Sequence, residues 1–431
     1  MKRRDFVKLL GAGGTALTLP ASLAGASGIG TGKPTPMHTT LQSTGGGVGM
    51  DRQVQIYMAG RLAGQKPDYP VSVDDLEKKA AEMMKPEAYG YVAGGAGAER
   101  TMQYNRNAFT RYRILPRMLR DVASRDLSVN LFGQKLPYPV LLAPIGVQSI
   151  IHPEAEEATA KAAASLGVPM VCSTVSSKPM ELIGGIKKDV PNWFQLYWPK
   201  NTELAVSLVE RAEKAGFGAI VVTLDTYLLA WRERDIQQAY LPFLYGDGLA
   251  NYFTDPVFQS ILGSDPAENP MDAIQLFAGI GTNASVTWDD LKILRESTNL
   301  PIVLKGILHP EDARLAMQYN MDGIIVSNHG GRQVDGSVAS LDMLPEVVKV
   351  VDGAIPVLFD SGIRRGADAF IALALGADAV LIGRPYAYGL ATNGEQGVRD
   401  VLHNFIADFD LTMGLAGVKK STEIRRDYLS G

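Results

Sequence analysis

The sequence predicts an α/β protein built on a (β/α)₈ TIM barrel, with an N-terminal helical segment and a long lid insertion after strand 4. Eight apolar, strand-like runs follow one another between residues 140 and 383, and helical stretches lie between most of them. The chain has 431 residues, 46% of them hydrophobic, whereas such a barrel typically needs ~250 residues. An open doubly wound sheet is the alternative, but no G-x-G-x-x-G follows the first strand.

The strands and helices of the barrel are predicted from apolar runs and helical periodicity. The expected strands are Val140–Ile145, Pro169–Ser173, Trp193–Tyr197, Ala219–Asp225, Pro301–Lys305, Gly323–Ser327, Pro356–Asp360 and Ala379–Gly383. The clearest helices are Pro153–Leu166, Thr202–Ala215, Pro310–Tyr319 and Ala367–Leu375. Residues 226–300 interrupt this alternation. An insertion on a βα loop lies over the catalytic face of a barrel, so we interpret this segment as a lid; plain structural elaboration is the alternative.

The N-terminal residues are predicted to be a targeting segment and not part of the folded domain. Residues 1–26 place Arg3 and Arg4 before a weakly apolar run and a small-residue cleavage site at 24–26, as in a twin-arginine signal peptide. We therefore expect export to the periplasm or another extracytoplasmic space of a bacterium; a basic cytosolic N-terminus is the alternative. Residues 27–50 are predicted to be a disordered linker, and residues 51–431 the catalytic domain, beginning with a helix over 74–84 capped by Ser72 and a short helix within 86–98.

Composition excludes several classes of function. The 42 basic and 46 acidic residues give a formal net charge of −4, so no global basic field favours nucleic acid. Cys172 is the single cysteine, which excludes an internal disulfide and a cysteine zinc site, and the five histidines form no metal cluster. No run after the signal approaches 18 apolar residues, so no transmembrane span is expected.

Polar side chains gather where the predicted strands end, which is the catalytic rim of such a barrel. The stretch 327–336, SNHGGRQVDG, follows the sixth strand and carries His329 and Arg332. A base and a fixed cation at one strand end suit an anionic substrate. Glycine-rich turns with arginines follow the last two strands, DSGIRRG at 360–366 and GRP at 383–385. This is the usual place for a phosphate in this fold, so a phosphorylated cofactor or substrate is predicted.

These motifs resemble, in order and spacing, those of the FMN-dependent L-2-hydroxy acid oxidase and dehydrogenase family. The matching stretches are FQLY at 194–197, VTLD at 222–225, LKG at 304–306, SNHGGRQ at 327–333, DSGIRRG at 360–366 and IGRP at 382–385. The resemblance covers about residues 72–429. LAWRERD at 229–235 and GILHPED at 306–312 are most similar to the lactate 2-monooxygenase and lactate oxidase branch.

The resemblance implies roles for seven residues around a 2-hydroxy acid. His329 is the implied general base and Asp225 its partner, Arg332 and Arg232 bind the carboxylate, and Tyr91 and Tyr197 hydrogen-bond the substrate. Lys305 lies beside the flavin and stabilises its negative charge. The implied FMN-binding residues are Pro144, Ile145, Gly146, Ser173, Gln195, Thr223, Lys305, Ser327, Asp360, Ser361, Gly362, Ile363, Arg364, Gly383 and Arg384.

The implied activity is oxidation of a small L-2-hydroxy acid, with L-lactate as the expected substrate and oxygen as the electron acceptor. The family resemblance also implies a homo-oligomer, with a tetramer expected. Gly146 is a departure from many family oxidases, which commonly carry Ala there; dehydrogenase and monooxygenase members tend to carry Gly. The acceptor therefore stays open between oxygen, with peroxide released or consumed in decarboxylation, and a quinone or carrier protein. A different FMN barrel chemistry would not need two arginines for a carboxylate.

Overall fold

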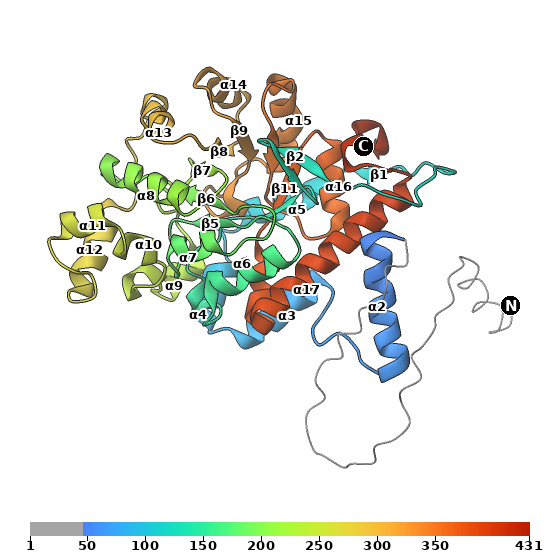
Figure 1. Cartoon of the computed structure of the whole chain (residues 1–431), viewed down its shortest axis with the longest axis horizontal. Coiled ribbons are helices and arrows are strands. Elements are labelled where there is room, and N and C mark those ends of the chain that lie inside the picture. Colours follow the sequence, from blue (N-terminus) through green and yellow to red (C-terminus); the bar gives the residue numbers. More distant parts are fainter. Residues whose placement is uncertain (1–45) are drawn as a thin grey trace, which may run out of the picture. The chain divides into compact units, whose positions relative to one another are not determined.

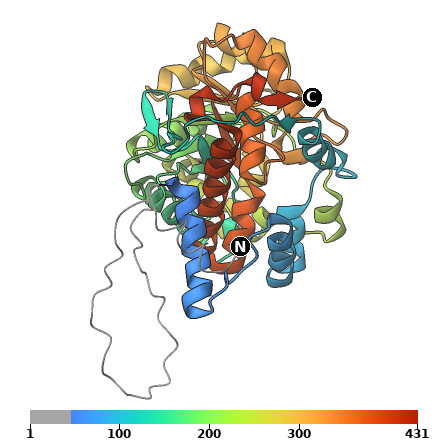
Figure 2. The same cartoon turned by 90° about the vertical axis from the view of Figure 1, so that its right-hand side faces the viewer.

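The computed structural model describes residues 46–431; the predicted signal peptide and most of the predicted linker lie outside the described residues. Helix α2 (Gly47–Ala63) begins inside residues 27–50, so the linker prediction was wrong at its C-terminal end. Packing and polar contacts hold this glycine-rich helix start: the Gly49 amide donates to Asp410 Oδ2 at 2.8 Å. Figures 1 and 2 show α2, in blue, alongside the long helix α17 (Arg384–Ala416), in red.

Eight parallel strands form the barrel, and all eight were predicted. They are β4 (Val140–Leu142), β5 (Val171–Ser173), β6 (Trp193–Leu196), β7 (Ile220–Thr223), β8 (Ile302–Ile307), β9 (Gly323–Val326), β10 (Val357–Phe359) and β11 (Ala379–Ile382). Consecutive strands are hydrogen-bonded neighbours, and β11 returns to β4. A bridge between Leu142 and Met170 joins β4 to the start of β5, which closes the ring. The (β/α)₈ fold class is thus confirmed.

One helix follows each strand and covers the outside of the barrel. These helices are α6 (Ala155–Ser165), α7 (Met180–Gly185), α8 (Thr202–Lys214), α13 (Leu291–Ser297), α14 (Pro310–Gln318), α15 (Ser340–Val351), α16 (Gly366–Ala374) and α17. Alternation along the strands separates two cores: Leu141 belongs to the cluster inside the barrel, whereas Val140 and Leu142 pack against the helices. A hairpin of β2 (Val129–Leu131) and β3 (Gln134–Leu136) adds its leucines to the inner cluster.

Three further helices follow α2 and precede the barrel: α3 (Val73–Met83), α4 (Pro86–Ala93) and α5 (Arg100–Phe109). The predicted helix starts at Val73, with Ser72 at its N-cap position but without the side-chain cap hydrogen bond that was expected, and α4 ends at the glycines as predicted. Strands β1 (Arg113–Ile114) and β12 (Leu429–Ser430) then pair and bring the C-terminus beside this segment. Over residues 46–431, no helix is long and apolar enough to span a membrane.

The segment 226–300 contains both an insertion and a barrel helix. Its elements are α9 (Glu233–Gln237), η2 (Pro242–Tyr245), α10 (Ala250–Phe253), α11 (Pro256–Leu262), α12 (Pro270–Ile280), η3 (Trp288–Asp290) and α13. Helix α13 packs against α8 as the fourth helix of the barrel, so the insertion itself ends before Leu291. The predicted range was therefore too long, because the helical period of α13 was not separated from the irregular residues before it.

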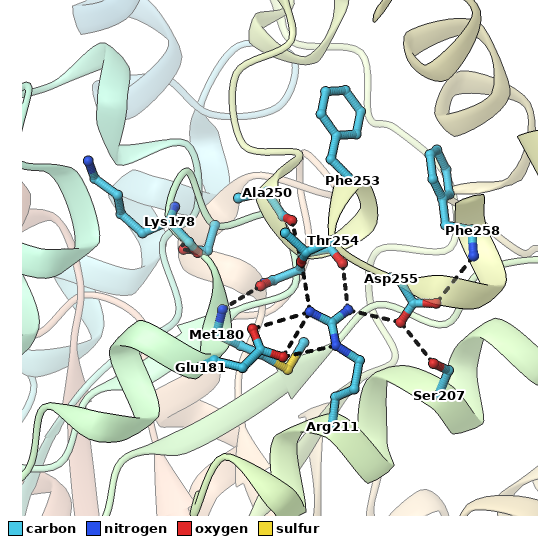
Figure 3. Close-up of polar contacts among 12 residues, drawn as sticks. Lys178, Met180, Glu181, Ser207, Arg211, Ala250, Phe253, Thr254, Asp255 and Phe258 are labelled. Atoms are coloured by element: carbon cyan, nitrogen blue, oxygen red, sulfur yellow. Dashed lines mark hydrogen bonds and ion pairs between the residues drawn. The ribbon is translucent and has the colours of Figure 1, made fainter. Parts of the chain in front are cut away.

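The middle of the insertion is fastened to the barrel by Arg211 of α8 (Figure 3). Its guanidinium donates to Asp255 Oδ2 at 2.9 Å, to the Asn251 carbonyl at 2.8 Å and to Glu181 Oε1 at 3.0 Å. Asp255 also caps α11 by accepting from two backbone amides. The fully buried Asn251 side chain reaches the carbonyls of Ser173 and Thr174 at the end of β5. The flanking parts are also held: Ser149 Oγ donates to Asp247 Oδ1 at 2.7 Å, and the Lys200 amide donates to the Ile280 carbonyl at 2.8 Å. The lid function therefore stays a prediction.

Candidate active site

A pocket opens at the carboxyl ends of the barrel strands. It is lined by Tyr91, Val92, Ala143, Pro144, Ile145, Gly146, Val147, Val175, Tyr197, Thr226, Leu229, Arg232, Phe243, Phe277, Gly281, Thr282, Lys305, His329, Gly330, Arg332, Asp360, Ser361, Gly362, Ile363, Arg364, Leu381, Gly383 and Arg384. Most of the predicted site residues line this one pocket. The others, Ser173, Gln195, Thr223, Asp225 and Ser327, lie at the ends of β5, β6, β7 and β9 without lining it.

His329 stands after β9 with its ring fixed by two neighbours. Its Nδ1 lies 2.7 Å from Asp225 Oδ1 and 3.1 Å from Thr226 Oγ1. Because Asp225 is an acceptor, Nδ1 carries the proton and Nε2 keeps its lone pair. The backbone at His329 is left-handed, with φ +57°, and its amide donates to Ser327 Oγ at 3.1 Å. This geometry leaves Nε2 as a base.

Burial is the main reason that the neutral form of His329 is favoured. Burial lowers the pKa of His329, and Asp225 opposes that effect. Burial disfavours ionised Asp225, but Lys305 and His329 together hold the pKa of Asp225 well below its ordinary value. Lys305 Nζ lies 3.6 Å from Asp225 Oδ2 and 3.7 Å from Asp360 Oδ2. A bulge at Gly306, with φ +106°, permits this approach, since a Cβ there would lie 2.9 Å from the Asp225 Cβ.

Two guanidinium groups face the ring of Tyr91, that of Arg232 buried and that of Arg332 partly buried. The Cζ of Arg332 lies 5.0 Å from the ring centroid and that of Arg232 lies 6.0 Å away. Burial, with repulsion from Arg232, lowers the pKa of Arg332 to about 9. An anion bound here would relieve that repulsion, so the pair forms an anion site. Arg332 Nη1 also donates to the carbonyls of Tyr91 and Gly94, at 2.6 and 2.8 Å, which holds α4 over the barrel mouth.

The insertion and two polar residues contribute groups that the sequence reasoning missed. Phe243 and Phe277 line the pocket and contact each other, and Phe243 also meets Tyr91 edge to face. Gln333 accepts from Arg232 Nη2 at 3.0 Å and donates to the Asp225 carbonyl at 2.6 Å. Gln333 lies inside the stretch that carries the base, and Thr226 follows Asp225 directly, so position alone could have identified these two. Nothing in the sequence pattern of residues 226–300 marks the two phenylalanines.

Tyr197 lies at the end of β6 with its ring stacked near His329, at a centroid separation of 6.5 Å and an interplanar angle of 23°. Burial raises the pKa of Tyr197 to about 12, so its hydroxyl remains a hydrogen-bond donor at neutral pH. Tyr91 approaches the same space from α4 outside the barrel. The structure therefore brings together the two tyrosines, the histidine and the two arginines that the sequence predicted.

The opposite end of the pocket is a second cationic region, after β10 and β11. Burial, with repulsion from Arg384, lowers the pKa of Arg364 to about 10. Ser361 and Gly362 have positive φ angles, +84° and +92°, and these two residues turn the loop that follows β10. Helix α17 begins at Arg384, directly after Gly383, and its N-terminus adds partial positive charge. Two partly buried arginines beside a helix start provide what a phosphate requires.

Among the buried polar atoms that have no hydrogen-bond partner within residues 46–431, Gln195 Nε2 and Thr223 Oγ1 lie at the ends of β6 and β7. Gln195 is oriented by Ser173, whose hydroxyl donates to Gln195 Oε1 at 3.0 Å, so Nε2 is left as a free donor. Orphaned polar atoms in a buried position call for a ligand. Together with the wall at Pro144–Gly146 and the arginines of the second region, they fit a flat, polar-edged cofactor with a phosphate.

Of the other four histidines, His38 lies outside the described residues, and the remaining three lie away from the pocket. His309 is the N-cap of α14, where its Nδ1 accepts from the Glu311 amide at 3.1 Å. His152 Nδ1 likewise accepts from the Glu154 amide, at 3.3 Å. Burial lowers the pKa of His403 to about 4. Cys172 is buried, as predicted. Among residues 46–431, no three His, Cys, Asp or Glu side chains are arranged to hold a metal ion.

A closed (β/α)₈ barrel with a base, an anion site and a phosphate site around one pocket defines a cofactor-dependent enzyme. Residues 80–431 match the family model of FMN-dependent dehydrogenases, and the chain belongs to this family of FMN-dependent oxidoreductases. The resemblance and the FMN cofactor predicted from the sequence are confirmed.

Comparisons with individual proteins support the same family assignment. An L-lactate oxidase of Lysinibacillus sphaericus is 46% identical over 366 residues, covering 84% of this chain and 93% of the relative. The human 2-hydroxyacid oxidase 1 is 40% identical, covering 80% and 93%. A crystal structure of a mandelate oxidase superposes with a TM-score of 0.74 at 39% identity, covering 84% of this chain and 98% of that one.

Proposed function

We propose that the protein oxidises a small L-2-hydroxy acid with FMN, that L-lactate is a substrate, and that oxygen accepts the electrons. The observation that carries the proposal is the pairing of His329 with Asp225 beside the guanidinium groups of Arg332 and Arg232. A 2-hydroxy acid needs a base for its hydroxyl and a cationic site for its carboxylate. L-Lactate oxidases of two bacteria, Lysinibacillus sphaericus and a Nostoc strain, are 46% and 42% identical to the chain.

In this proposal His329 Nε2 takes the proton of the substrate hydroxyl. Asp225, 2.7 Å from Nδ1, stabilises the imidazolium that forms. Arg332 and Arg232 bind the carboxylate, and Tyr91 and Tyr197 hydrogen-bond the carboxylate and hydroxyl. Since the pocket is lined by Phe243 and Phe277 on the insertion side, the substrate side chain lies among apolar groups.

FMN, when bound, supplies the acceptor for the two electrons. Lys305 would stand beside the ring as a fixed positive charge, and Gln195 Nε2 and Thr223 Oγ1 would hydrogen-bond its polar edge. The backbone of Pro144–Gly146 would form the wall behind the ring. Residues of the β9, β10 and β11 loops would hold the ribityl chain and phosphate: Ser327, Asp360, Ser361, Gly362, Ile363, Arg364, Gly383 and Arg384.

The alternative is a dehydrogenase that passes electrons to a quinone or a carrier protein. Gly146 favours this alternative, or a monooxygenase that decarboxylates its product, over simple peroxide release. A Cβ at Gly146 would lie 2.5 Å from the Val175 carbonyl oxygen, so alanine does not fit the present backbone.

The test is anaerobic mixing of the FMN-loaded protein with L-lactate, followed by addition of oxygen. Rapid bleaching of the flavin absorbance and rapid recovery with oxygen are expected. Bleaching followed by slow recovery with oxygen would show that oxygen is not the acceptor and would favour the dehydrogenase. A flavin that no small 2-hydroxy acid bleaches would refute the activity. Product analysis separates pyruvate plus peroxide from acetate plus carbon dioxide.

We also propose that residues 1–26 direct export by the twin-arginine route and that the mature enzyme is a homo-tetramer. Paired arginines before an apolar run support the first proposal, and family resemblance supports the second. Replacing Arg3 and Arg4 by lysine should retain the protein in the cytoplasm, as measured by fractionation; unchanged export would refute the route. Light scattering on the mature protein measures its mass against the tetramer.

A further inference from the structure

Asn105 of α5 forms a reciprocal pair with Asn328, the residue before His329. Asn105 Nδ2 donates to Asn328 Oδ1 at 2.8 Å, and Asn328 Nδ2 donates to Asn105 Oδ1 at 2.7 Å. Asn105 is 2% exposed and Asn328 is 6% exposed. Neither residue lines the pocket. The pair thus ties a helix outside the barrel to the segment that carries the proposed base.

The pair closes both ends of the loop that follows β9. At its start, Asn328 Oδ1 accepts from the Gly331 amide at 3.1 Å. At its end, Asn328 Nδ2 donates to the Val338 carbonyl at 3.1 Å, and Asn105 Oδ1 accepts from the Ser340 amide at 3.2 Å. Every side-chain oxygen and nitrogen of the two amides is therefore used.

This network admits one orientation of the Asn328 amide. If that amide rotated by half a turn, its NH₂ would face the Gly331 N–H and its oxygen would face the Val338 carbonyl. Both contacts would then be repulsive, and the pairing with Asn105 would be lost. Asn105 supplies the donor and the acceptor that select the observed orientation.

His329 needs such support because its backbone is left-handed, with φ +57°, which is disfavoured for a residue with a side chain. The loop is held on its other side by Ser361, whose Oγ accepts from the amides of Asn328 at 3.3 Å and Gly330 at 3.0 Å. Asn105 and Ser361 thus hold the residues on either side of His329, and the 2.7 Å contact with Asp225 depends on the position of that backbone.

We propose that Asn105 is a positioning residue for His329: it holds the Asn328 amide, and through it the backbone that aims the imidazole. The inference rests on the base role of His329 in the proposed function. Asn105 also packs against the loop of the phosphate end, since a Cβ at Gly362 would lie 2.9 Å from the Asn105 carbonyl oxygen. This contact involves the backbone of Asn105 and survives a change of its side chain.

The test is Asn105→Asp, because a carboxylic acid imitates the amide only while protonated. The protonated acid donates to Asn328 Oδ1 and accepts from Asn328 Nδ2, whereas the carboxylate has no donor and repels that oxygen. In the FMN-loaded variant, the rate of anaerobic bleaching by L-lactate should fall at least about tenfold as pH rises through a new ionisation. The wild type should show the opposite trend, since His329 must lose its proton to act.

Asn107→Asp is the matched control, since Asn107 lies on the same helix with an exposed side chain; its pH profile should follow the wild type. Asn105→Leu removes both hydrogen bonds to Asn328 and the one from the Ser340 amide, and it should slow bleaching at every pH, with FMN retained. If Asn105→Asp does not retain FMN, Asn105→Ser is measured in its place, and bleaching at the wild-type rate overturns the proposal.

Two further results would overturn the positioning role. One is an Asn105→Asp profile that follows the wild type. The other is a loss in Asn105→Asp that is uniform across pH and equal to that of Asn105→Leu, which would assign Asn105 to packing alone. Failure of the proposed function is a separate result, because the wild type itself would then not be bleached by any 2-hydroxy acid.

Discussion

The two sides of the pocket are built in different ways. The base side, from β7 to β9, is a set of polar and charged side chains that hold one another in place. His329 contacts Asp225, Lys305 lies between Asp225 and Asp360, and Arg232 donates a hydrogen bond to Gln333. The far side, from β4 and β5, presents backbone and apolar groups, with Gly146 pressed against Val175.

Polar groups on the far side stand behind the wall and not in the pocket. Gln148 Nε2 donates to the Ile145 carbonyl at 2.8 Å, and the buried Glu156 accepts from the Gln148 amide at 3.1 Å. Burial raises the pKa of Glu156 to about 7. Tyr386 donates to the Ala143 carbonyl at 2.8 Å. The carbonyl groups of the wall thus accept hydrogen bonds from the side away from the pocket. The surface that would face the flavin ring consists of backbone and carbon atoms.

This difference separates the two halves of the proposed reaction. In that proposal, side chains on the base side would act on the proton and carboxylate of the substrate. The far side would set only how much space lies behind the flavin ring. Substitutions on the base side should therefore change the anaerobic bleaching rate, and substitutions on the far side should change the rate of recovery with oxygen.

The largest effect is expected from His329→Gln. Glutamine cannot take the hydroxyl proton, so anaerobic bleaching by L-lactate should slow by roughly 10²–10⁴-fold while FMN stays bound. Recovery with oxygen after chemical reduction should be unchanged. His309→Gln is the matched control, because His309 caps α14 outside the pocket. Bleaching of His329→Gln at a rate near that of the wild type would remove His329 from the base role.

Arg332→Lys should have the next largest effect. Lysine loses the planar fork and cannot both hold the carbonyls of Tyr91 and Gly94 and bind a carboxylate. Loss of one charge-assisted hydrogen bond costs about 1.5–3 kcal/mol, so kcat/KM for L-lactate should fall by about 10–150-fold, largely through KM. Arg234→Lys, at a surface ion pair with Glu99, is the control and should change neither constant. An unchanged KM in Arg332→Lys would contradict the anion site.

The same difference explains what could be predicted from the sequence. The base side was predictable because chemistry resides in residue types at strand ends, as for His329 and Lys305, and because eight regular repeats place those ends on one rim. The contacts of Asn105, Phe277 and Gly306 were not predictable, since they depend on the distance between segments remote in the chain. The end of the insertion was misplaced because α13 is short and follows irregular residues.

Of the three substitutions, Gly146→Ala should have the smallest effect on anaerobic bleaching by L-lactate. It tests the role of the far side directly. The new methyl would meet the Val175 carbonyl at 2.5 Å, and that oxygen cannot move freely because it accepts from the Val147 amide at 2.8 Å. Overpacking of this kind costs about 1–3 kcal/mol, so the free energy of unfolding should fall by that amount.

Because the methyl would press on Val175, which lines the far side of the pocket, recovery with oxygen should slow more than bleaching by L-lactate does in Gly146→Ala. Gly185→Ala, on α7 with nothing within 4 Å of the added Cβ, is the control for the substitution itself. Stopped-flow measurement of both half-reactions gives the comparison. If bleaching slowed as much as recovery, the far side would also position the substrate, and the separation of the two sides would be wrong.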